Sequence, residues 1–357
     1  MLRAKRAAAV VGGGVGGLAA AIGLRQAGWD VVVFERSSGL PRTGTGLGMW
    51  PSALRALDAL SVGARARDVG RLQGNGVFRR PDGTAFATLD VARIQQRHGE
   101  PVYLLSRPAL LGLLADALPD GVVRFDSPVK DVEELRSQYD VLLGADGIRS
   151  LVRTKVFGDV SRLRFAGATV WRGVADVDCP EGGETWGAGV KFGLTPQEPG
   201  RTNWYAVLTA PEGYRPPGDD ITELRRLFGD WHDPIPSILG QYDASEVLRH
   251  DLHYLDPPLR RYVRGTVALL GDAAHAMTPD LGQGACQALI DGMTLAECLG
   301  AAATVAEGLA EYDRRRRRAT QRIARMALWA GKLSQVRRYT RARDRILRFA
   351  LALGTPA

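Results

Sequence analysis

The sequence contains little cysteine and no long apolar run. Its 357 residues include three cysteines, Cys179, Cys286 and Cys298, and no pair has C-x-x-C spacing. We therefore expect neither a disulfide scaffold nor a metal site, which suits a reducing cytoplasm. The apolar run that follows Arg6 ends at Gly12, too early for a signal peptide, and no segment approaches the length of a membrane span. We expect a cytoplasmic protein without stable membrane association.

Acidic residues are almost missing near the C-terminus. Between Arg314 and Arg348 there are 14 Arg or Lys residues and one acid, Asp344, so this segment carries the basic excess behind the net charge of +8. Apolar residues at helical spacing from 323 to 336 predict a packing helix with its arginines on the opposite, solvated face. The alternative is a nucleic-acid or membrane patch, but stacking aromatics and a nucleic-acid-binding module are absent. We expect no nucleic-acid partner.

A glycine-rich loop follows the first apolar run. Residues 7–11 predict a buried parallel strand, and residues 18–27 predict a helix. The loop between them reads Gly12-x-Gly14-x-x-Gly17. In this pattern Gly12 permits a tight turn, Gly14 lets the backbone approach a pyrophosphate, and Gly17 lets the helix pack closely on the strand. The loop predicts a dinucleotide site.

A second predicted strand, residues 30–34, ends in Glu35 and Arg36. An acid at this distance from the first glycine can accept hydrogen bonds from the ribose hydroxyls of a dinucleotide. Both residues are therefore cofactor-binding candidates. The pattern does not distinguish FAD from NAD(P).

Two further motifs follow predicted strands. Gly144-Ala145-Asp146-Gly147-Ile148-Arg149-Ser150 follows the first, and Gly271-Asp272-Ala273-Ala274-His275 follows the second, with Pro279 and Gly282-Gln283-Gly284-Ala285 behind it. Asp272 at a strand end can accept hydrogen bonds from ribityl hydroxyls. A helix that opens at Gly282 to Ala285 directs N–H groups and a positive dipole at the flavin N1–O2 edge. The three motifs together favour FAD as one long cofactor.

The pattern of predicted helices and strands changes along the chain. Strand–helix alternation gives way, at about residues 163–248, to short β-prone runs between Pro and Gly turns. We expect an α/β protein in which a Rossmann-like FAD-binding domain is interleaved with a mostly antiparallel substrate domain, plus C-terminal helices. The expected division is 1–72, 101–160 and 250–300 for the FAD-binding domain, 73–100 and 161–249 for the substrate domain, and 301–357 for the helices.

The three motifs resemble those of the class A flavoprotein monooxygenases, the para-hydroxybenzoate hydroxylase-type family, over nearly the whole chain. Asp146-Gly147 with Ser150 and Arg153 is similar to the family's D-G-x-x-S-x-x-R motif, and Gly271-Asp272 is similar to its GD motif. The resemblance implies that Asp146 touches FAD and the nicotinamide cofactor, and that Asp272 binds the ribityl chain. It also places Arg107 against FAD, Pro279 and residues 282–285 beside the isoalloxazine ring, and Asp291 in the helix that follows.

The resemblance implies an FAD-dependent hydroxylase that oxidises NADPH or NADH as a transient co-substrate. Such an oxidoreductase inserts one oxygen of O2 into an aromatic or other electron-rich small molecule through a flavin C4a-hydroperoxide. The absence of a second complete G-x-G-x-x-G fits a nicotinamide cofactor without its own domain. Segments 44–51 and 171–173 resemble the branch with urate hydroxylases, salicylate hydroxylase-like enzymes and zeaxanthin epoxidases. We expect a monomer or a homodimer.

Two catalytic candidates lie on predicted strands of the substrate domain. Arg172 could orient an anionic or carbonyl oxygen of the substrate, and Tyr205 could hydrogen-bond a phenol or a heteroaromatic N–H. Because side chains alternate along a strand, Trp171 and Arg172 cannot both face the flavin. The alternatives are a solvated arginine and a core tyrosine with a satisfied hydroxyl.

Three other functions stay open at the level of the sequence. A flavin-dependent reductase would oxidise NAD(P)H without an oxygenated product. A halogenase on the same fold would carry W-x-W-x-I-P, which the sequence lacks. A non-catalytic FAD-binding protein would bind flavin without substrate-stimulated turnover.

Overall fold

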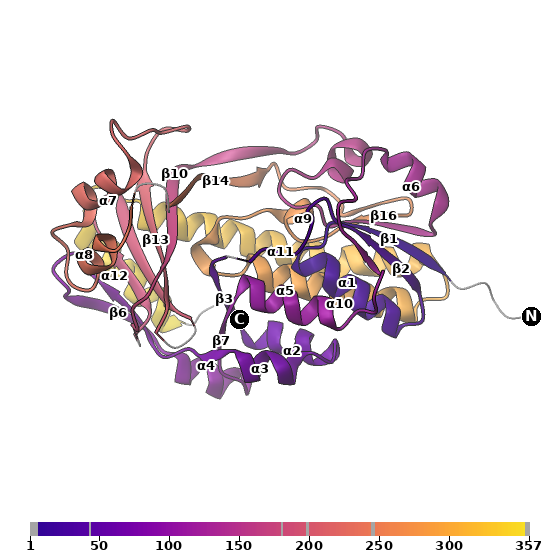
Figure 1. Cartoon of the computed structure of the whole chain (residues 1–357), viewed down its shortest axis with the longest axis horizontal. Helices are drawn as coiled ribbons and strands as arrows, with labels where there is room; N and C mark the ends of the chain where they lie inside the picture. The colour runs from indigo at the N-terminus through magenta and orange to yellow at the C-terminus, as the bar shows by residue number, and fades with distance from the viewer. Residues whose placement is uncertain (1–5, 43, 180, 198–199, 244–246, 354–357) are drawn as a thin grey trace, which may run out of the picture.

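The computed structural model describes residues 6–42, 44–179, 181–197, 200–243 and 247–353. The strands form two large sheets that lie towards opposite ends of the long axis, with helices between and around them (Figure 1). The expected α/β architecture with parallel and antiparallel sheets and C-terminal helices is confirmed.

The first sheet has six strands around β1. In sheet order they are β15 (Val263–Arg264), β16 (Val267–Leu269), β9 (Val141–Gly144), β1 (Ala7–Val11), β2 (Asp30–Phe34) and β8 (Val123–Arg124). All neighbours pair in parallel except β15 with β16. Ala8, Ala9 and Val10 are fully buried, because helices cover a parallel sheet on both faces. The carboxyl ends of β1, β9 and β16 lead into the three motifs.

The second sheet has seven strands. In sheet order they are β14 (Leu248–Asp256), β10 (Arg162–Ala175), β13 (Thr202–Thr209), β12 (Val190–Pro196), β11 (Gly183–Trp186), β5 (Gly76–Arg79) and β6 (Ala85–Leu89). The prediction of a mostly antiparallel sheet is confirmed, and β11 with β5 is a parallel exception. Strand β10 begins as early as Arg162, because β14 pairs along most of its length.

The third sheet is small and has three strands. It consists of β3 (Gly46–Met49), β7 (Tyr103–Ser106) and β4 (Arg71–Leu72). At the end of β7, the hydroxyl of Ser106 accepts a hydrogen bond from the Ala109 N–H at 3.3 Å and caps the following helix. This cap fixes the start of α5 at Arg107.

Helices cover the sheets and connect them. They are α1 (Val15–Gln26), α2 (Pro51–Ala59), α3 (Gly63–Val69), α4 (Val91–His98), α5 (Arg107–Asp116), α6 (Val132–Gln138), α7 (Asp220–Phe228), α8 (Ile235–Gly240), α9 (Asp272–His275), α10 (Gly284–Ala301), α11 (Val305–Ser334) and α12 (Thr340–Leu353), with a π-helical turn at Arg153–Phe157 and a 3-10 turn at Pro279–Leu281. None of the helices in the described ranges combines the length and the apolar character needed to cross a bilayer.

The basic C-terminal segment is helical as predicted, but its arginines are not all on a solvated face. Helix α11 runs along the molecule between the two ends (Figure 1). Arg316 on α11 and Arg343 on α12 are 8% and 2% exposed, respectively. Each is buried because it has a buried carboxylate partner, Asp291 for Arg316 and Asp344 for Arg343. The prediction of a wholly solvated arginine face is wrong for these two residues.

Candidate functional site

The glycines of the first loop have different surroundings. Gly12 has φ of 107°, and a Cβ there would lie 2.4 Å from the Ala145 carbonyl oxygen. A Cβ on Gly17 would lie 2.0 Å from the Gly12 carbonyl oxygen. By contrast, a Cβ on Gly14 would meet no atom within 4 Å. Thus Gly12 and Gly17 are required by the packing of the loop, whereas Gly14 leaves open space at the N-terminus of α1.

Glu35 lies at the end of β2 beside this loop. Its carboxylate accepts hydrogen bonds from the backbone N–H groups of Gly13 at 2.7 Å and Ser37 at 2.8 Å. Burial opposes ionisation of Glu35, but these hydrogen bonds outweigh it and lower the pKa of the carboxyl. Glu35 is thus an anionic acceptor at the loop. Arg36 is exposed, and its charge adds to the stabilisation of the Glu35 carboxylate.

The second motif is a turn closed by Asp146. The Asp146 carboxylate accepts from the Ser150 hydroxyl at 2.5 Å and from the Val152 N–H at 3.1 Å. Arg153 then donates to the Ile148 carbonyl at 2.7 Å and to the Ala273 carbonyl at 2.9 Å. Because Ala273 belongs to the third motif, Arg153 ties the second and third motifs together.

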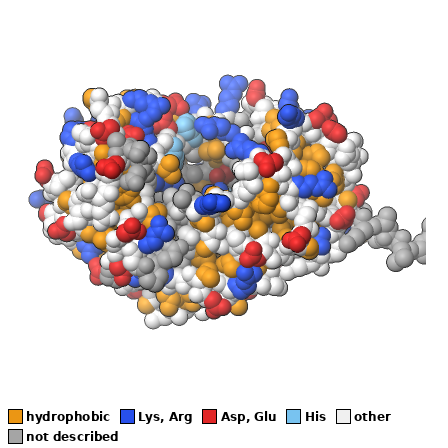
Figure 2. Space-filling model, viewed as in Figure 1, with side chains coloured by type: hydrophobic (Ala, Val, Ile, Leu, Met, Phe, Trp, Pro, Cys, Tyr) orange, Lys and Arg blue, Asp and Glu red, His pale blue; other side chains and the backbone are white. Residues whose placement is uncertain are grey.

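Asp272 lies in the first turn of α9. Its side chain is accessible to solvent, yet many protein atoms lie around the carboxyl group, so this group is in a recess. Burial raises the pKa of Asp272, and the nearby charges of His275, Arg107 and Arg153 partly offset that effect. Figure 2 shows a hollow near the middle of one face, with Lys and Arg side chains at its rim. Arg107 of α5 is close enough to Asp272 of the third motif for its charge to lower the pKa of that carboxyl group.

The segment from the end of α9 to the start of α10 contains polar atoms without hydrogen-bond partners among the described residues. The 3-10 turn Pro279–Leu281 ends at Gly282, which has φ of 62°, and α10 begins at Gly284 after the buried Gln283. The predicted helix start is therefore close to, but two residues later than, Gly282; Ala285 lies in the first turn. Four buried atoms in this region have no hydrogen-bond partner among the described residues: His275 Nδ1, Thr278 Oγ1, Asp280 Oδ2 and Gln283 Nε2.

These features fit a bound FAD. Buried polar atoms normally have partners, so a cluster of unsatisfied ones beside a helix N-terminus suits a polar ring edge. The open space at Gly14 suits a pyrophosphate, and the recess at Asp272 suits the hydroxyl-bearing chain between the two ends of the cofactor. The assignment of individual residues to FAD stays a prediction.

Asp291 on α10 holds the third motif in place. Its Oδ2 atom accepts from the Gly271 N–H at 2.9 Å and lies 2.6 Å from His275 Nε2. Its Oδ1 atom accepts from Arg316 Nε at 2.6 Å. His275 therefore has a structural partner. Asp291 is fully buried, so it supports the third motif from within the core.

The register of the second sheet settles which face Arg172 occupies. Arg172 on β10 is directly opposite Tyr205 on β13, so the two side chains share a face. Trp171 occupies the other face, where its Nε1 donates to Asp220 at 2.9 Å and its ring is buried against α7 and α8. Arg172 is close enough to Arg107 for the charge of Arg107 to influence its pKa. The prediction that Trp171 and Arg172 lie on opposite faces is confirmed.

The side chain of Arg172 has no hydrogen bond or ion pair with any residue in the described ranges, and it is partly exposed. Burial lowers the pKa of its guanidinium, and the nearby charge of Arg107 lowers it further. An unpaired guanidinium in a recess has the chemistry to bind an anion or a carbonyl oxygen. It is not a fully solvated surface arginine.

A buried charged cluster that the sequence did not predict lies beside Tyr205. Lys191 donates to Glu184 at 3.1 Å and to Asp280 at 2.9 Å, and the Tyr205 hydroxyl donates to the same Glu184 oxygen. Lys191 and Asp280 are 5% and 4% exposed in their side chains. Their juxtaposition depends on strand register and on the loop after α9. The only hint in the sequence is a lysine within an apolar strand.

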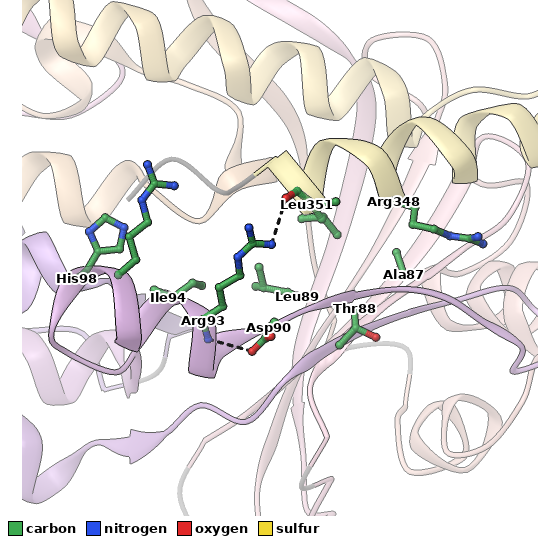
Figure 3. A pocket seen from close by; sticks show the side chains of 11 residues that line it. Ala87, Thr88, Leu89, Asp90, Arg93, Ile94, His98, Arg348 and Leu351 are labelled. Carbon is green, nitrogen blue, oxygen red and sulfur yellow. Dashed lines mark hydrogen bonds between the residues drawn. The ribbon is translucent and has the colours of Figure 1, made fainter.

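Two further pockets lie outside this site. One, of about 230 Å³, is between α4, β6 and α12 and is lined by Arg93, Arg97, His98 and Arg348 with apolar neighbours (Figure 3). Another, of about 480 Å³, is lined by Leu104, Leu105, Ser106 and Gln197 among others. No residue of the three motifs lines either pocket. They are therefore not the convergence point of the motifs.

Known proteins match the chain over most of its length. A family model described as FAD binding domain matches residues 119–327, more than half of the chain, and one described as FAD dependent oxidoreductase matches residues 7–171. The aurachin C monooxygenase/isomerase of Stigmatella aurantiaca is 37% identical over 324 residues, covering 85% of this chain and 83% of that protein. The FAD-dependent urate hydroxylase of Klebsiella pneumoniae is 30% identical over 330 residues, covering 87% and 85%.

A solved structure agrees with these matches. The crystal structure of Klebsiella pneumoniae HpxO complexed with FAD and uric acid superposes with a TM-score of 0.86 at 25% identity, covering 98% of this chain and 93% of that one. A salicylate hydroxylase substrate complex has the same fold, with a TM-score of 0.78 at 22% identity. The matched regions include all three motifs and both large sheets. The chain therefore belongs to the class A flavoprotein monooxygenases and is an FAD-dependent monooxygenase.

Proposed function

We propose that the chain hydroxylates a small heteroaromatic or phenolic molecule whose anionic or carbonyl oxygen is bound by Arg172, with NADPH or NADH as the transient reductant. The observation that carries this proposal is the unpaired guanidinium of Arg172, on the sheet face that it shares with Tyr205 and within electrostatic reach of Arg107. Relatives named for urate hydroxylation and for aurachin C oxygenation support a cyclic, unsaturated substrate class.

We assign the cofactor contacts along the length of FAD to the three motifs. Gly12, Gly14 and Gly17 with Glu35 and Arg36 would hold the adenosine and pyrophosphate end. Asp146, Arg107 and Asp272 would hold the middle, and Pro279, Gly282, Gln283, Gly284 and Ala285 would lie beside the ring. FAD, when bound, supplies the electron transfer and oxygen activation that side chains cannot perform.

The side chains of this protein position and activate the substrate. A guanidinium stabilises a substrate oxygen that carries negative charge, and an anionic oxygen raises the electron density of the ring to be hydroxylated. Tyr205 fixes a second polar atom of the same ring. Val170 and Val207, buried on this sheet face two residues along from Arg172 and Tyr205, exclude water beside these groups. Two fixed polar contacts in an apolar surround set the orientation of the ring.

Arg172→Ala tests this proposal. Loss of a charged hydrogen bond costs about 1.5–3 kcal/mol, so the KM for an active substrate should rise about tenfold or more, or NAD(P)H oxidation should uncouple into peroxide, while FAD stays bound. Arg164→Ala is the matched control, since Arg164 lies on the same strand with a side chain 66% exposed. Wild-type kinetics in Arg172→Ala would refute the assignment.

Incorporation of one atom of ¹⁸O2 into the product measures the monooxygenase reaction directly, because a reductase would consume NAD(P)H without it and a halogenase would require halide. We further propose that the protein is cytoplasmic and acts as a monomer or a homodimer. Light scattering on the purified enzyme would establish the oligomeric state.

A further inference from the structure

Glu184 on β11 receives three hydrogen-bond donors at once. Trp186 Nε1 donates to its Oε2 atom at 2.5 Å, Lys191 Nζ donates to its Oε1 atom at 3.1 Å, and the Tyr205 hydroxyl donates to the same Oε1 atom. Its side chain is 15% exposed. A carboxylate has only acceptor sites, so every partner must present a proton to it. Glu184 therefore fixes the direction of each of these bonds.

The strand register explains how Tyr205 reaches Glu184. Glu184 is directly opposite Gly193 on β12, Gly193 is directly opposite Tyr205 on β13, and Tyr205 is directly opposite Arg172 on β10. These four residues form one row on one face of the sheet. A Cβ on Gly193 would lie 2.0 Å from the Tyr205 ring, so the ring lies over the glycine. This arrangement directs the hydroxyl of Tyr205 away from Arg172 and towards Glu184.

The cluster also connects the sheet to the loop after α9. Lys191 donates to both Glu184 and Asp280, at 3.1 Å and 2.9 Å. Its charge balances one of the two carboxylates and holds Glu184 as an acceptor. Burial lowers the pKa of Lys191 but the two carboxylates outweigh that effect and raise it, so the ammonium stays charged. Glu184 is rigid because its partners come from three strands and, through Lys191, from the loop.

A free tyrosine hydroxyl can turn to donate or to accept, but this one has a single proton that is committed to Glu184. We propose that Glu184 is a positioning residue that holds Tyr205 with its lone pair towards the substrate, and that the enzyme selects substrates with an N–H or O–H donor on the ring whose oxygen is bound by Arg172. This inference rests on the proposed function, because it takes Arg172 and Tyr205 as substrate contacts. It narrows the substrate class to rings that carry an N–H or O–H donor as well as the oxygen bound by Arg172.

The test uses two probes of nearly the same shape, quinolin-2(1H)-one and 1-methylquinolin-2-one. Both have the carbonyl, but only the first has the N–H. Dissociation constants are measured on the FAD-loaded enzyme from the change in flavin absorbance. We expect the N–H probe to bind at least about tenfold more tightly in the wild type, since a buried acceptor left unpaired is costly. Equal binding of the two probes, or no binding of the N–H probe, would overturn the inference.

Glu184→Gln tests the role of the carboxylate. The amide N–H of glutamine can donate to Tyr205, which frees the Tyr205 proton to turn outwards, so the preference for the N–H probe should fall to about threefold or less. General loosening of the site would weaken both probes together and leave their ratio unchanged, and such a result would contradict the inference. Tyr205→Phe, which removes only one oxygen atom, should abolish the preference even if Glu184→Gln fails to fold.

Arg172→Ala separates this inference from the proposed function. If both probes bind equally in the wild type but both weaken in Arg172→Ala, the role of Glu184 is refuted and the proposed function stands. If Arg172→Ala leaves both affinities unchanged, the proposed function itself is refuted.

Discussion

Arg316 on α11 donates from Nε to Oδ1 of Asp291 on α10 across 2.6 Å, and both side chains are at least nine-tenths buried. The other carboxylate oxygen of Asp291 accepts from the Gly271 N–H at 2.9 Å and lies 2.6 Å from His275 Nε2. One arginine of a basic helix thus supports the turn that presents Asp272. Helix α11 is therefore part of the structure that supports the predicted cofactor site.

Replacing Arg316 by glutamine should destabilise the protein strongly. Removal of one partner of a buried ion pair leaves an uncompensated charge and costs about 3–5 kcal/mol in the free energy of unfolding. Urea unfolding followed by circular dichroism measures this loss. Arg314→Gln is the control, since its side chain is 74% exposed and its pairing with Glu311 is worth about 0–1 kcal/mol. Equal effects of the two substitutions would contradict the structural role of Arg316.

The same pair predicts a dependence of stability on pH. Burial opposes ionisation of Asp291, but Arg316 and His275 outweigh it and lower the pKa of the carboxyl to about 2. The stabilisation is therefore complete above the unfolded pKa of about 3.9 and is lost as the pH falls from there through about 2. The free energy of unfolding should decrease more steeply between pH 4 and pH 2 in the wild type than in Asp291→Asn. Parallel curves would show that Asp291 is not responsible.

Two glycines of the first loop should respond differently to alanine. In Gly14→Ala the new methyl group meets no protein atom, so the apoprotein should keep its stability while the dissociation constant for FAD rises about tenfold or more, because the methyl fills the space for the pyrophosphate. In Gly17→Ala the methyl would lie 2.0 Å from the Gly12 carbonyl oxygen, which should cost about 1–3 kcal/mol or more of stability. Thermal unfolding of the apoproteins and fluorescence titration with FAD distinguish the two effects. Similar losses of apoprotein stability would refute the assignment of Gly14.

His250 provides a probe of the Arg172 position. Burial, followed by the charge of Arg172, lowers the pKa of His250 to about 4. Arg172→Ala should raise this pKa, although burial keeps it below the ordinary value of about 6.5. NMR titration of the imidazole, assigned with His250→Gln, measures the shift. The pKa should stay at about 4 in Arg164→Ala, and an unchanged value in Arg172→Ala would place that guanidinium elsewhere.

The cofactor side of the site could be predicted from the sequence because its residues are local. Gly12, Gly14 and Gly17 lie within one strand–loop–helix unit, and Asp146 and Asp272 each follow a buried strand. Parallel strands of one sheet bring such loops to the same edge, so their convergence needs no knowledge of side-chain packing.

The substrate side could not be predicted to the same extent. The row of Glu184, Gly193, Tyr205 and Arg172 depends on the register of four strands, and a slip of one residue would move each side chain to the other face. Arg316 could not be distinguished from its neighbours in an arginine run. The signal in the sequence was that Arg316 is four residues from both Tyr312 and Thr320, which places the three on one side of a helix. The structure shows that Tyr312 and Thr320 are buried.

The visible spectrum of the purified chain measures whether the three distant motifs bind one FAD along its length. The purified protein should be yellow, with one FAD per chain, and Asp272→Ala should lose this colour together with its flavin. A colourless protein that takes up no added FAD, or an Asp272→Ala variant with full flavin content, would show that the motifs do not bind the cofactor in this way.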